Sequence, residues 1–185
     1  MVRDNHVYLL VGPRGSGKSE YCQRLLANQP GFSVVSRDSI VSRLCGTEHP
    51  DAYSGGIEVG MMIMYRQLCH KLSTWTGLRL ILDCWTGESS ERKSILEKLH
   101  QYGADQVTAL YFVTPPEVVS EWFWKKPGIA KMEEMISQQG QGLAFYFEDA
   151  PKRDYQLFHR YARKIDSDGF NKVIRVNPLD PLIVL

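Results

Sequence analysis

The stretch that decides the fold is an eight-residue loop near the start of the chain, Gly12-Pro13-Arg14-Gly15-Ser16-Gly17-Lys18-Ser19. It matches the pattern G-x-x-x-x-G-K-[ST], in which a glycine-rich backbone wraps around phosphate groups. The apolar run His6–Val11 precedes the loop, and a segment of helical periodicity follows it. A strand before the motif and a helix after it favour a nucleotide site over a glycine-rich turn without chemical purpose.

Each part of the loop has an expected role in binding ATP. The glycines let several backbone N–H groups converge on one point, at a helix N-terminus that favours negative charge. We expect Lys18 to reach the β- and γ-phosphates and the Ser19 hydroxyl to hold Mg²⁺. Arg14 is expected to lie over the adenine or to contact a phosphate. All eight residues are therefore predicted to bind ATP, and Lys18 is also a catalytic candidate.

The rest of the chain alternates between short apolar runs and segments of helical periodicity, which is typical of β-α-β units and a parallel sheet. Helices are expected from about Gly17, after Ser36, from Gly56 to Trp75, from Ser89 to Gly103, from Pro115 and from Arg153 to Asp168. The expected strands are His6–Val11, Phe32–Ser36, Leu78–Asp83, Val107–Val113 and Lys172–Val176. This pattern predicts a three-layer αβα sandwich in a single domain spanning residues 1–185.

The longest expected helix carries apolar side chains at spacings of three and four residues. We predict that they form one buried stripe, made of Ile57, Met61, Met64, Leu68, Leu72 and Trp75. Such a stripe would pack this helix against the sheet.

The second expected strand is followed by an aspartate, Asp38, in the sequence Val34-Val35-Ser36-Arg37-Asp38. Ligands of open α/β sheets bind at the carboxyl ends of the strands. A carboxylate at that edge can accept the proton of an attacking hydroxyl, so Asp38 is the candidate general base. The alternative is a helix N-cap, and one side chain can serve both roles.

A second aspartate, Asp83, ends the apolar run Leu80-Ile81-Leu82. An acidic residue at the end of such a strand resembles a Walker B carboxylate, which holds Mg²⁺ directly or through water. Asp83 is therefore a candidate catalytic residue and, with Ser19, a candidate metal ligand. The alternative is a strand-end aspartate that caps the next turn.

Residues 125–142 are polar, contain glycines and lie between two expected helices. We predict that they form a small flexible lid. Lys125 and Lys126, at its start, are the cations available to neutralise charge on a transferred phosphate, and both are catalytic candidates.

The composition narrows the class of protein. Lys and Arg total 22 and Asp and Glu total 21, so no overall basic excess indicates a long nucleic-acid footprint. The cysteines lack the spacing of a zinc site or a disulfide framework, which favours a reducing, cytoplasmic compartment. No apolar stretch approaches the ~20 residues that span a bilayer, and the N-terminus lacks signal-peptide features, so no membrane partner is expected.

Together these residues resemble the phage polynucleotide-kinase-like branch of the P-loop kinases. The resemblance rests on the phosphate loop, the Ser36-Arg37-Asp38 turn, Asp83 with Arg92 after it, and the segment Gly169-Phe170-Asn171-Lys172-Val173-Ile174. It implies a sheet ordered 2-3-1-4-5 and transfer of the γ-phosphate of ATP to the 5′-hydroxyl of a nucleic acid end. It also implies Asp38 as the base, Lys18 and Ser19 as ATP and Mg²⁺ ligands, and Asp83 beside the transferred phosphate.

Two positions depart from the family's pattern. Polynucleotide kinases of this branch usually carry an arginine three residues after the base and another in the lid. This chain has Val41 at the first position and no arginine between Arg92 and Arg153. A kinase for a nucleoside, a sugar, an antibiotic or another small molecule is therefore a second hypothesis. A nucleotide-binding regulatory protein with little transfer activity is a third.

Overall fold

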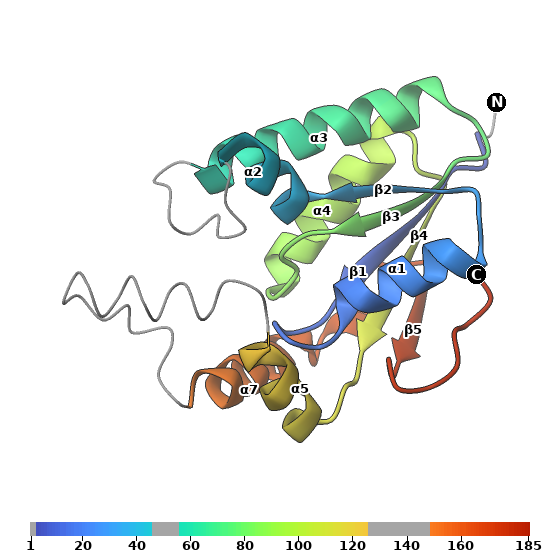
Figure 1. The fold of residues 1–185 in the computed structure, drawn as a ribbon. Coiled ribbons are helices and arrows are strands. Elements are labelled where there is room, and N and C mark those ends of the chain that lie inside the picture. Colours follow the sequence, from blue (N-terminus) through green and yellow to red (C-terminus); the bar gives the residue numbers. More distant parts are fainter. Residues whose placement is uncertain (1–2, 46–55, 126–148) are drawn as a thin grey trace.

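A parallel five-stranded sheet, ordered β2-β3-β1-β4-β5, forms the centre of the fold (Figure 1). The computed structural model describes residues 3–45, 56–125 and 149–185. The strands are β1 (His6–Val11), β2 (Phe32–Ser36), β3 (Arg79–Asp83), β4 (Gln106–Phe112) and β5 (Lys172–Val176). Each predicted strand is present, with bounds that agree or differ by one residue, and the predicted strand order is confirmed.

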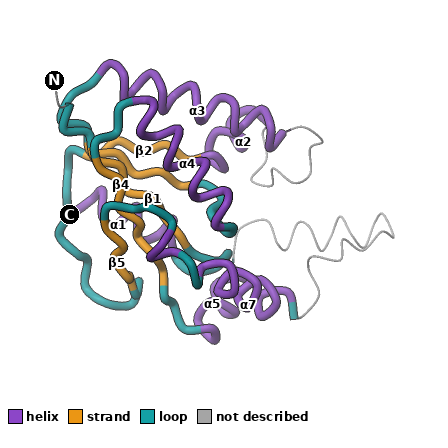
Figure 2. Tube along the Cα trace, turned by 180° about the vertical axis from the view of Figure 1, so that it is seen from behind, coloured by secondary structure: helices purple, strands orange, loops and turns teal. Residues whose placement is uncertain are grey.

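Helices connect the strands and cover both faces of the sheet, as the view from behind also shows (Figure 2). They are α1 (Lys18–Asn28), α2 (Arg37–Cys45), α3 (Gly56–Thr74), α4 (Ser89–Tyr102), α5 (Pro116–Trp124), α7 (Ala150–Ala162) and the short 3₁₀ helix η2 (Ile165–Ser167). The predicted three-layer αβα sandwich is therefore confirmed.

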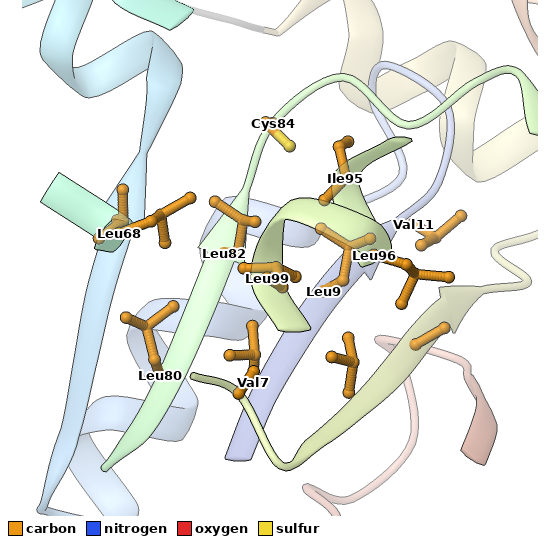
Figure 3. Packing of buried hydrophobic residues seen from close by; sticks show 14 of the residues in the cluster. Val7, Leu9, Val11, Leu68, Leu80, Leu82, Cys84, Ile95, Leu96 and Leu99 are labelled. Atoms are coloured by element: carbon orange, nitrogen blue, oxygen red, sulfur yellow. The ribbon is translucent and has the colours of Figure 1, made fainter. Parts of the chain in front are cut away.

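Alternate residues of each strand enter different helical layers, because successive side chains of a strand point to opposite faces. Val7 and Leu9 of β1 pack in the cluster that contains Leu68 of α3 and Leu99 of α4 (Figure 3). Leu10 packs in the opposite cluster, with α1 and the C-terminal segment. The central strands are thus buried on both faces, which explains their continuous apolar sequences.

Helix α3 keeps only part of the predicted apolar stripe. Its fully buried members are Met64, Leu68 and Leu72, and Met61 is partly buried against the same cluster. Trp75 is 59% exposed, so its prediction as a core residue is wrong. The helix ends one residue earlier, and the Trp75 carbonyl accepts a hydrogen bond from Asn5 Nδ2 at 3.0 Å. Beyond the end of a helix, its periodicity no longer determines where a side chain points.

The bounds predicted for the last helix are also wrong. Helix α7 begins at Ala150 instead of Arg153, because Pro151 fits the first turn of a helix. It ends at Ala162, and a separate 3₁₀ turn, η2, occupies residues that were predicted to continue the helix.

The predicted lid falls mostly beyond the described part of the chain. Residues 126–142, with Lys126, are outside the described residues, and Lys125 is the first lid residue within them. Among the helices that the structure describes, none combines the length and the apolar character needed to cross a membrane.

Candidate active site

The phosphate loop connects β1 to α1, and its glycines determine its shape. Gly15 (φ 78°) and Gly17 (φ 82°) adopt the left-handed conformation that residues with a side chain avoid. A Cβ atom at Gly12 would lie 2.7 Å from Ser16 Oγ and 2.8 Å from Phe112 Cβ. The loop is therefore as tightly curled as a backbone cradle for phosphate requires.

Hydrogen bonds hold the loop and place a charge over it. Ser16 Oγ donates to Pro13 O (2.8 Å), and Thr114 Oγ1 donates to Ser16 O (2.8 Å). The Lys18 ammonium donates to Gly12 O (2.8 Å) and to Pro13 O (2.9 Å). Positive charge above a curled backbone at a helix N-terminus fits the phosphates of a nucleotide.

A cavity of about 750 Å³ lies beside the loop, at the carboxyl ends of the strands. Its lining includes Gly12, Arg14, Lys18, Ser19, Asp38 and Asp83. Strand register explains this convergence, because β2 pairs Ser36 with Asp83 and β1 pairs Leu9 with Leu82. Three neighbouring strand ends thus bring together predicted residues that are far apart in the sequence.

Asp38 lies in the first turn of α2, and the preceding arginine holds its carboxylate. Arg37 donates to Asp38 Oδ1 from Nε (2.8 Å) and from Nη2 (2.7 Å). Among the described residues, Asp38 Oδ2 has no hydrogen-bond partner, so it can accept a proton. The capping role suggested as an alternative belongs to Ser36, whose Oγ accepts the N–H of Ser39 at 3.3 Å.

Asp83 ends β3 and lines the cavity together with Ser19 of α1. A carboxylate and a hydroxyl are hard oxygen donors of the kind that Mg²⁺ prefers. These two residues therefore fit a magnesium ion that is shared with a bound triphosphate.

The residue after Asp83, Cys84, is buried, and burial raises the pKa of its thiol well above the usual range. Cys84 therefore stays protonated and is a poor nucleophile.

Lys125 lies at the end of α5 and does not line the cavity. Its ammonium pairs with Glu121, one helical turn earlier, and both side chains are exposed. A catalytic role for Lys125, as for Lys126, therefore stays a prediction.

The far wall of the cavity comes from α3 and α4 and was not predicted. Its members include Met61, Tyr65, Ser90, Glu91, Ser94 and Lys98. Ser90, Ser94 and Lys98 recur every four residues, a spacing that places side chains on one face of a helix. The four-residue spacing was the signal in the sequence that these side chains share a helix face. Only the packing of the helices decides that this face lines the cavity.

Helices α5 and α7 support the phosphate loop from another side. Asp154 Oδ2 accepts the backbone N–H of Arg14 at 3.2 Å, and a Cβ atom at Gly15 would lie 2.7 Å from Val119 O. A second hollow of about 500 Å³ lies here, and Arg14 and Trp85 line both hollows. Asp154 is thus a loop-positioning residue that the sequence patterns did not indicate.

Arg92, which carried part of the family resemblance, is buried in the core. Its Nε lies 2.5 Å from Asp168 Oδ2. Its other nitrogens donate to the carbonyls of Thr86 (3.0 Å), Gly87 (2.6 Å) and Tyr161 (3.1 Å). Arg92 therefore fastens the loop between β3 and α4 to the end of α7.

The phosphate loop and both aspartates fall within residues 7–148, which match the family model AAA_33, described as an AAA domain. The chain belongs to this AAA domain family. The family, the loop and the sheet order together support a P-loop kinase-like phosphotransferase.

The proteins that this AAA domain chain resembles include two shikimate kinases and a chain of an RNA repair complex. Shikimate kinase of Synechococcus sp. (strain RCC307) is 35% identical over 69 residues, or 37% of this chain and 35% of that protein. A chain of the Pnkp1/Rnl/Hen1 RNA repair complex superposes with a TM-score of 0.61 at 17% identity, covering 86% of this chain and 46% of that one. Shikimate kinase from Acinetobacter baumannii, in complex with shikimate, gives a TM-score of 0.53 at 20% identity, covering 94% and 84%.

These matches bear on the fold more than on the acceptor. The chain spans about a third of the Synechococcus relative and less than half of the RNA repair chain. One neighbour belongs to an RNA repair complex and another is a shikimate kinase, so the shared fold does not select the phosphate acceptor.

Proposed function

We propose that this protein transfers the γ-phosphate of ATP to a hydroxyl group, with Asp38 as the general base. The observation that carries the proposal is that Lys18, Ser19, Asp38 and Asp83 all line the same cavity. A phosphate-binding loop, oxygen donors suited to Mg²⁺ and a carboxylate suited to a hydroxyl proton are the parts that phosphoryl transfer requires.

The residues divide the work by position. Bound ATP with Mg²⁺ supplies the phosphoryl group and neutralises part of its charge. The loop backbone and Lys18 hold the phosphates, and Ser19 and Asp83 provide oxygen ligands for the metal. Asp38 Oδ2 takes the proton of the attacking hydroxyl, while Arg37 holds the same carboxylate through Oδ1.

For the acceptor, the family resemblance and the RNA repair neighbour favour the 5′-hydroxyl of a nucleic acid end. One observation favours a small hydroxyl compound instead. Val41, at the position of the family's phosphate-gripping arginine, is fully buried, and a Cβ atom at Gly60 would lie 2.3 Å from its Cγ2. The position packs α2 against α3 and is not available to an acceptor strand.

The deciding experiment offers γ-labelled ATP and Mg²⁺ with a panel of acceptors. The panel contains 5′-hydroxyl DNA and RNA oligonucleotides, nucleosides, sugars and shikimate. Asp38→Asn is compared with Asp166→Asn. This control alters the exposed pair that Asp166 forms with Arg175 of β5, the edge strand at the opposite end of the sheet from β2. We expect label on one acceptor class with the wild type and with Asp166→Asn, and no label with Asp38→Asn.

The same experiment separates the three hypotheses. Label on oligonucleotides supports a polynucleotide kinase, and label on a metabolite supports a small-molecule kinase. ATP binding without transfer to any member of the panel would contradict the proposal and favour a nucleotide-binding regulatory protein.

A further inference from the structure

The part of the cavity remote from the phosphate loop is formed by α3 and α4 and is lined by polar, apolar and basic side chains. Met61 and Tyr65 of α3 line it, and Ser90, Ser94 and Lys98 line it from α4. From Ser90 to Lys98 the wall extends roughly 12 Å, because eight residues of a helix rise ~1.5 Å each. Since α4 begins shortly after the end of β3, this wall leads away from the strand ends that carry Asp38 and Asp83.

Lys98 provides the positive charge of this wall. Its Nζ lies 3.9 Å from the centroid of the Tyr65 ring, in a cation–π contact that holds the half-buried side chain at the cavity. Within the described part of the chain, Lys98 forms no ion pair with a carboxylate. Burial raises the pKa of Tyr65 to about 12, so the phenol stays protonated and can donate a hydrogen bond.

The carboxylates along the cavity are engaged elsewhere. Glu91 Oε2 accepts the N–H of Glu88 at 3.2 Å, at the start of α4. Asp38 is held by Arg37, and Asp83 lies at the strand end, beside the phosphate loop. The remote wall therefore presents hydrogen-bond donors and the Lys98 cation, and the Glu91 carboxylate beside them is hydrogen-bonded to the backbone at the start of α4.

Building on the proposed function, we propose that the acceptor carries an oxyanion group at the end remote from the reacting hydroxyl, and that Lys98 binds this group. The group is a phosphate or a carboxylate, and the hydroxyls of Tyr65 and Ser94 are available as further donors. The acceptor is thus an elongated hydroxyl compound that lies along α4 with its reacting end at Asp38.

Electrostatics and positioning both support this assignment. A partly buried ammonium attracts an anion more strongly than one in bulk water, because the effective dielectric constant is lower. An anchor at the remote end also orients the hydroxyl toward the base, which lowers the entropy cost of reaction. A lysine that only packed α3 against α4 would leave acceptor binding unchanged.

The test measures binding instead of transfer. The full chain is saturated with Mg²⁺ and a non-hydrolysable ATP analogue, which occupies the phosphate loop. It is titrated in a calorimeter with inorganic phosphate, with shikimate, and with a 5′-hydroxyl dinucleotide that carries or lacks a 3′-phosphate. We expect saturable binding of at least one anionic probe, weakened at least about tenfold by Lys98→Met.

Two further variants control the result. Lys93→Met removes an exposed lysine of the same helix that does not line the cavity, and it should bind as the wild type does. Lys98→Arg keeps the charge and should restore most of the affinity lost in Lys98→Met. Thermal unfolding of each variant checks that α3 and α4 still pack.

The probes identify the source of the oxyanion. Tighter binding of the 3′-phosphorylated dinucleotide than of its unphosphorylated form identifies a nucleotide phosphate, and Lys98-dependent binding of shikimate identifies a carboxylate. If no probe binds the wild type, or if Lys98→Met binds every probe unchanged, the proposal is overturned. A chain that shows Lys98-dependent binding but no label transfer would retain the anion site and lose the proposed function.

Discussion

Two arginine–aspartate pairs lie near the candidate site, and their surroundings differ. Arg37 and Asp38 are adjacent in the sequence, 2.7 Å apart, with side chains that are 16% and 61% exposed. Arg92 and Asp168 are separated by 76 residues, 2.5 Å apart, and both side chains are completely buried. The first pair opens on the cavity, whereas the second fastens the β3–α4 loop to the C-terminal part of the chain.

The difference shows that burial determines whether an arginine–aspartate pair suits catalysis or stabilises the fold. An ion pair whose carboxylate is mostly exposed contributes less to stability than a buried pair, since water competes for the carboxylate. Its carboxylate can therefore turn to another partner, which a general base must do. A buried pair cannot exchange partners without a large desolvation cost, and breaking it leaves an uncompensated charge in the core. Asp38 is suited to chemistry, and Asp168 is suited to holding the loop next to Asp83.

The largest effect is expected from Asp38→Asn. Removing the general base should lower the transfer rate by about 10²- to 10⁴-fold, because the amide cannot take the proton. ATP affinity and the melting temperature should stay close to the wild type, since the side chain is mostly exposed. Single-turnover transfer of labelled phosphate measures the rate, and calorimetry measures ATP binding. Equal loss of ATP affinity would mean that Asp38 serves the nucleotide instead of the hydroxyl.

A loss of stability, instead of a loss of transfer activity, is expected from Asp168→Ala. It leaves the Arg92 guanidinium buried without its counter-charge and should reduce the free energy of unfolding by about 3–5 kcal/mol. Asp166→Ala is the matched control, because it breaks an exposed pair and should cost at most about 1 kcal/mol. Urea denaturation of both variants provides the measurement. Similar unfolding free energies in the two variants would remove the distinction between the pairs.

A smaller effect is expected from Gly15→Ala, which extends the comparison to the phosphate loop. The left-handed conformation should cost about 1–2 kcal/mol, and the new Cβ would press on Val119 O, 2.7 Å away. ATP affinity should fall with the distortion of the loop. Gly31→Ala has the same kind of strain (φ 105°) with no atom within 4 Å of the Cβ, so it should lower stability and leave ATP binding intact. If the two variants bind ATP equally well, the loop geometry is not what holds the phosphates.

The smallest effect concerns a half-buried histidine of α7, His159. Burial lowers the pKa of His159 below its ordinary value of 6.5, its Nδ1 lies 2.7 Å from Tyr111 Oη, and within the described structure its buried Nε2 has no partner. The unfolded chain therefore binds the proton more readily. The stabilisation is complete above about pH 6.5 and is lost as the pH falls toward the folded pKa.

Melting temperatures at about pH 7.5 and about pH 5.5 test this dependence. His159→Gln should reduce the loss at the lower pH, although His6, whose pKa burial also lowers, contributes in the same direction. His70→Gln, at an exposed position, serves as the control. An unchanged pH dependence in His159→Gln would assign the effect to other groups.

Local patterns predicted the parts of the fold that depend on neighbouring residues. The strand His6–Val11 and the loop after it were predicted with the observed bounds, because a buried parallel strand reads as a continuous apolar run. Asp38 and Asp83 were predicted as site residues from their place at strand ends. Trp75 was predicted wrongly, because the apolar period continues past the end of α3 although the helix does not.

The residues that were not predicted share a dependence on contacts between distant segments. Asp154 reaches the loop from α7, 140 residues away, and Lys98 meets Tyr65 only because α3 packs beside α4. The spacing of residues within one helix or strand does not predict a contact with a distant segment, because the partners come together only when the helices pack on the sheet.

The sequence by itself determined the phosphate loop, the strands and the two candidate carboxylates, because a turn that requires glycine and a strand buried on both faces each leave a local signature. The tertiary structure alone decided that Arg92 is a core residue and that Lys98 lines the cavity. Each of these outcomes depends on which helix face packs against which neighbour, and the burial that follows determines whether a charged side chain supports the fold or meets a ligand.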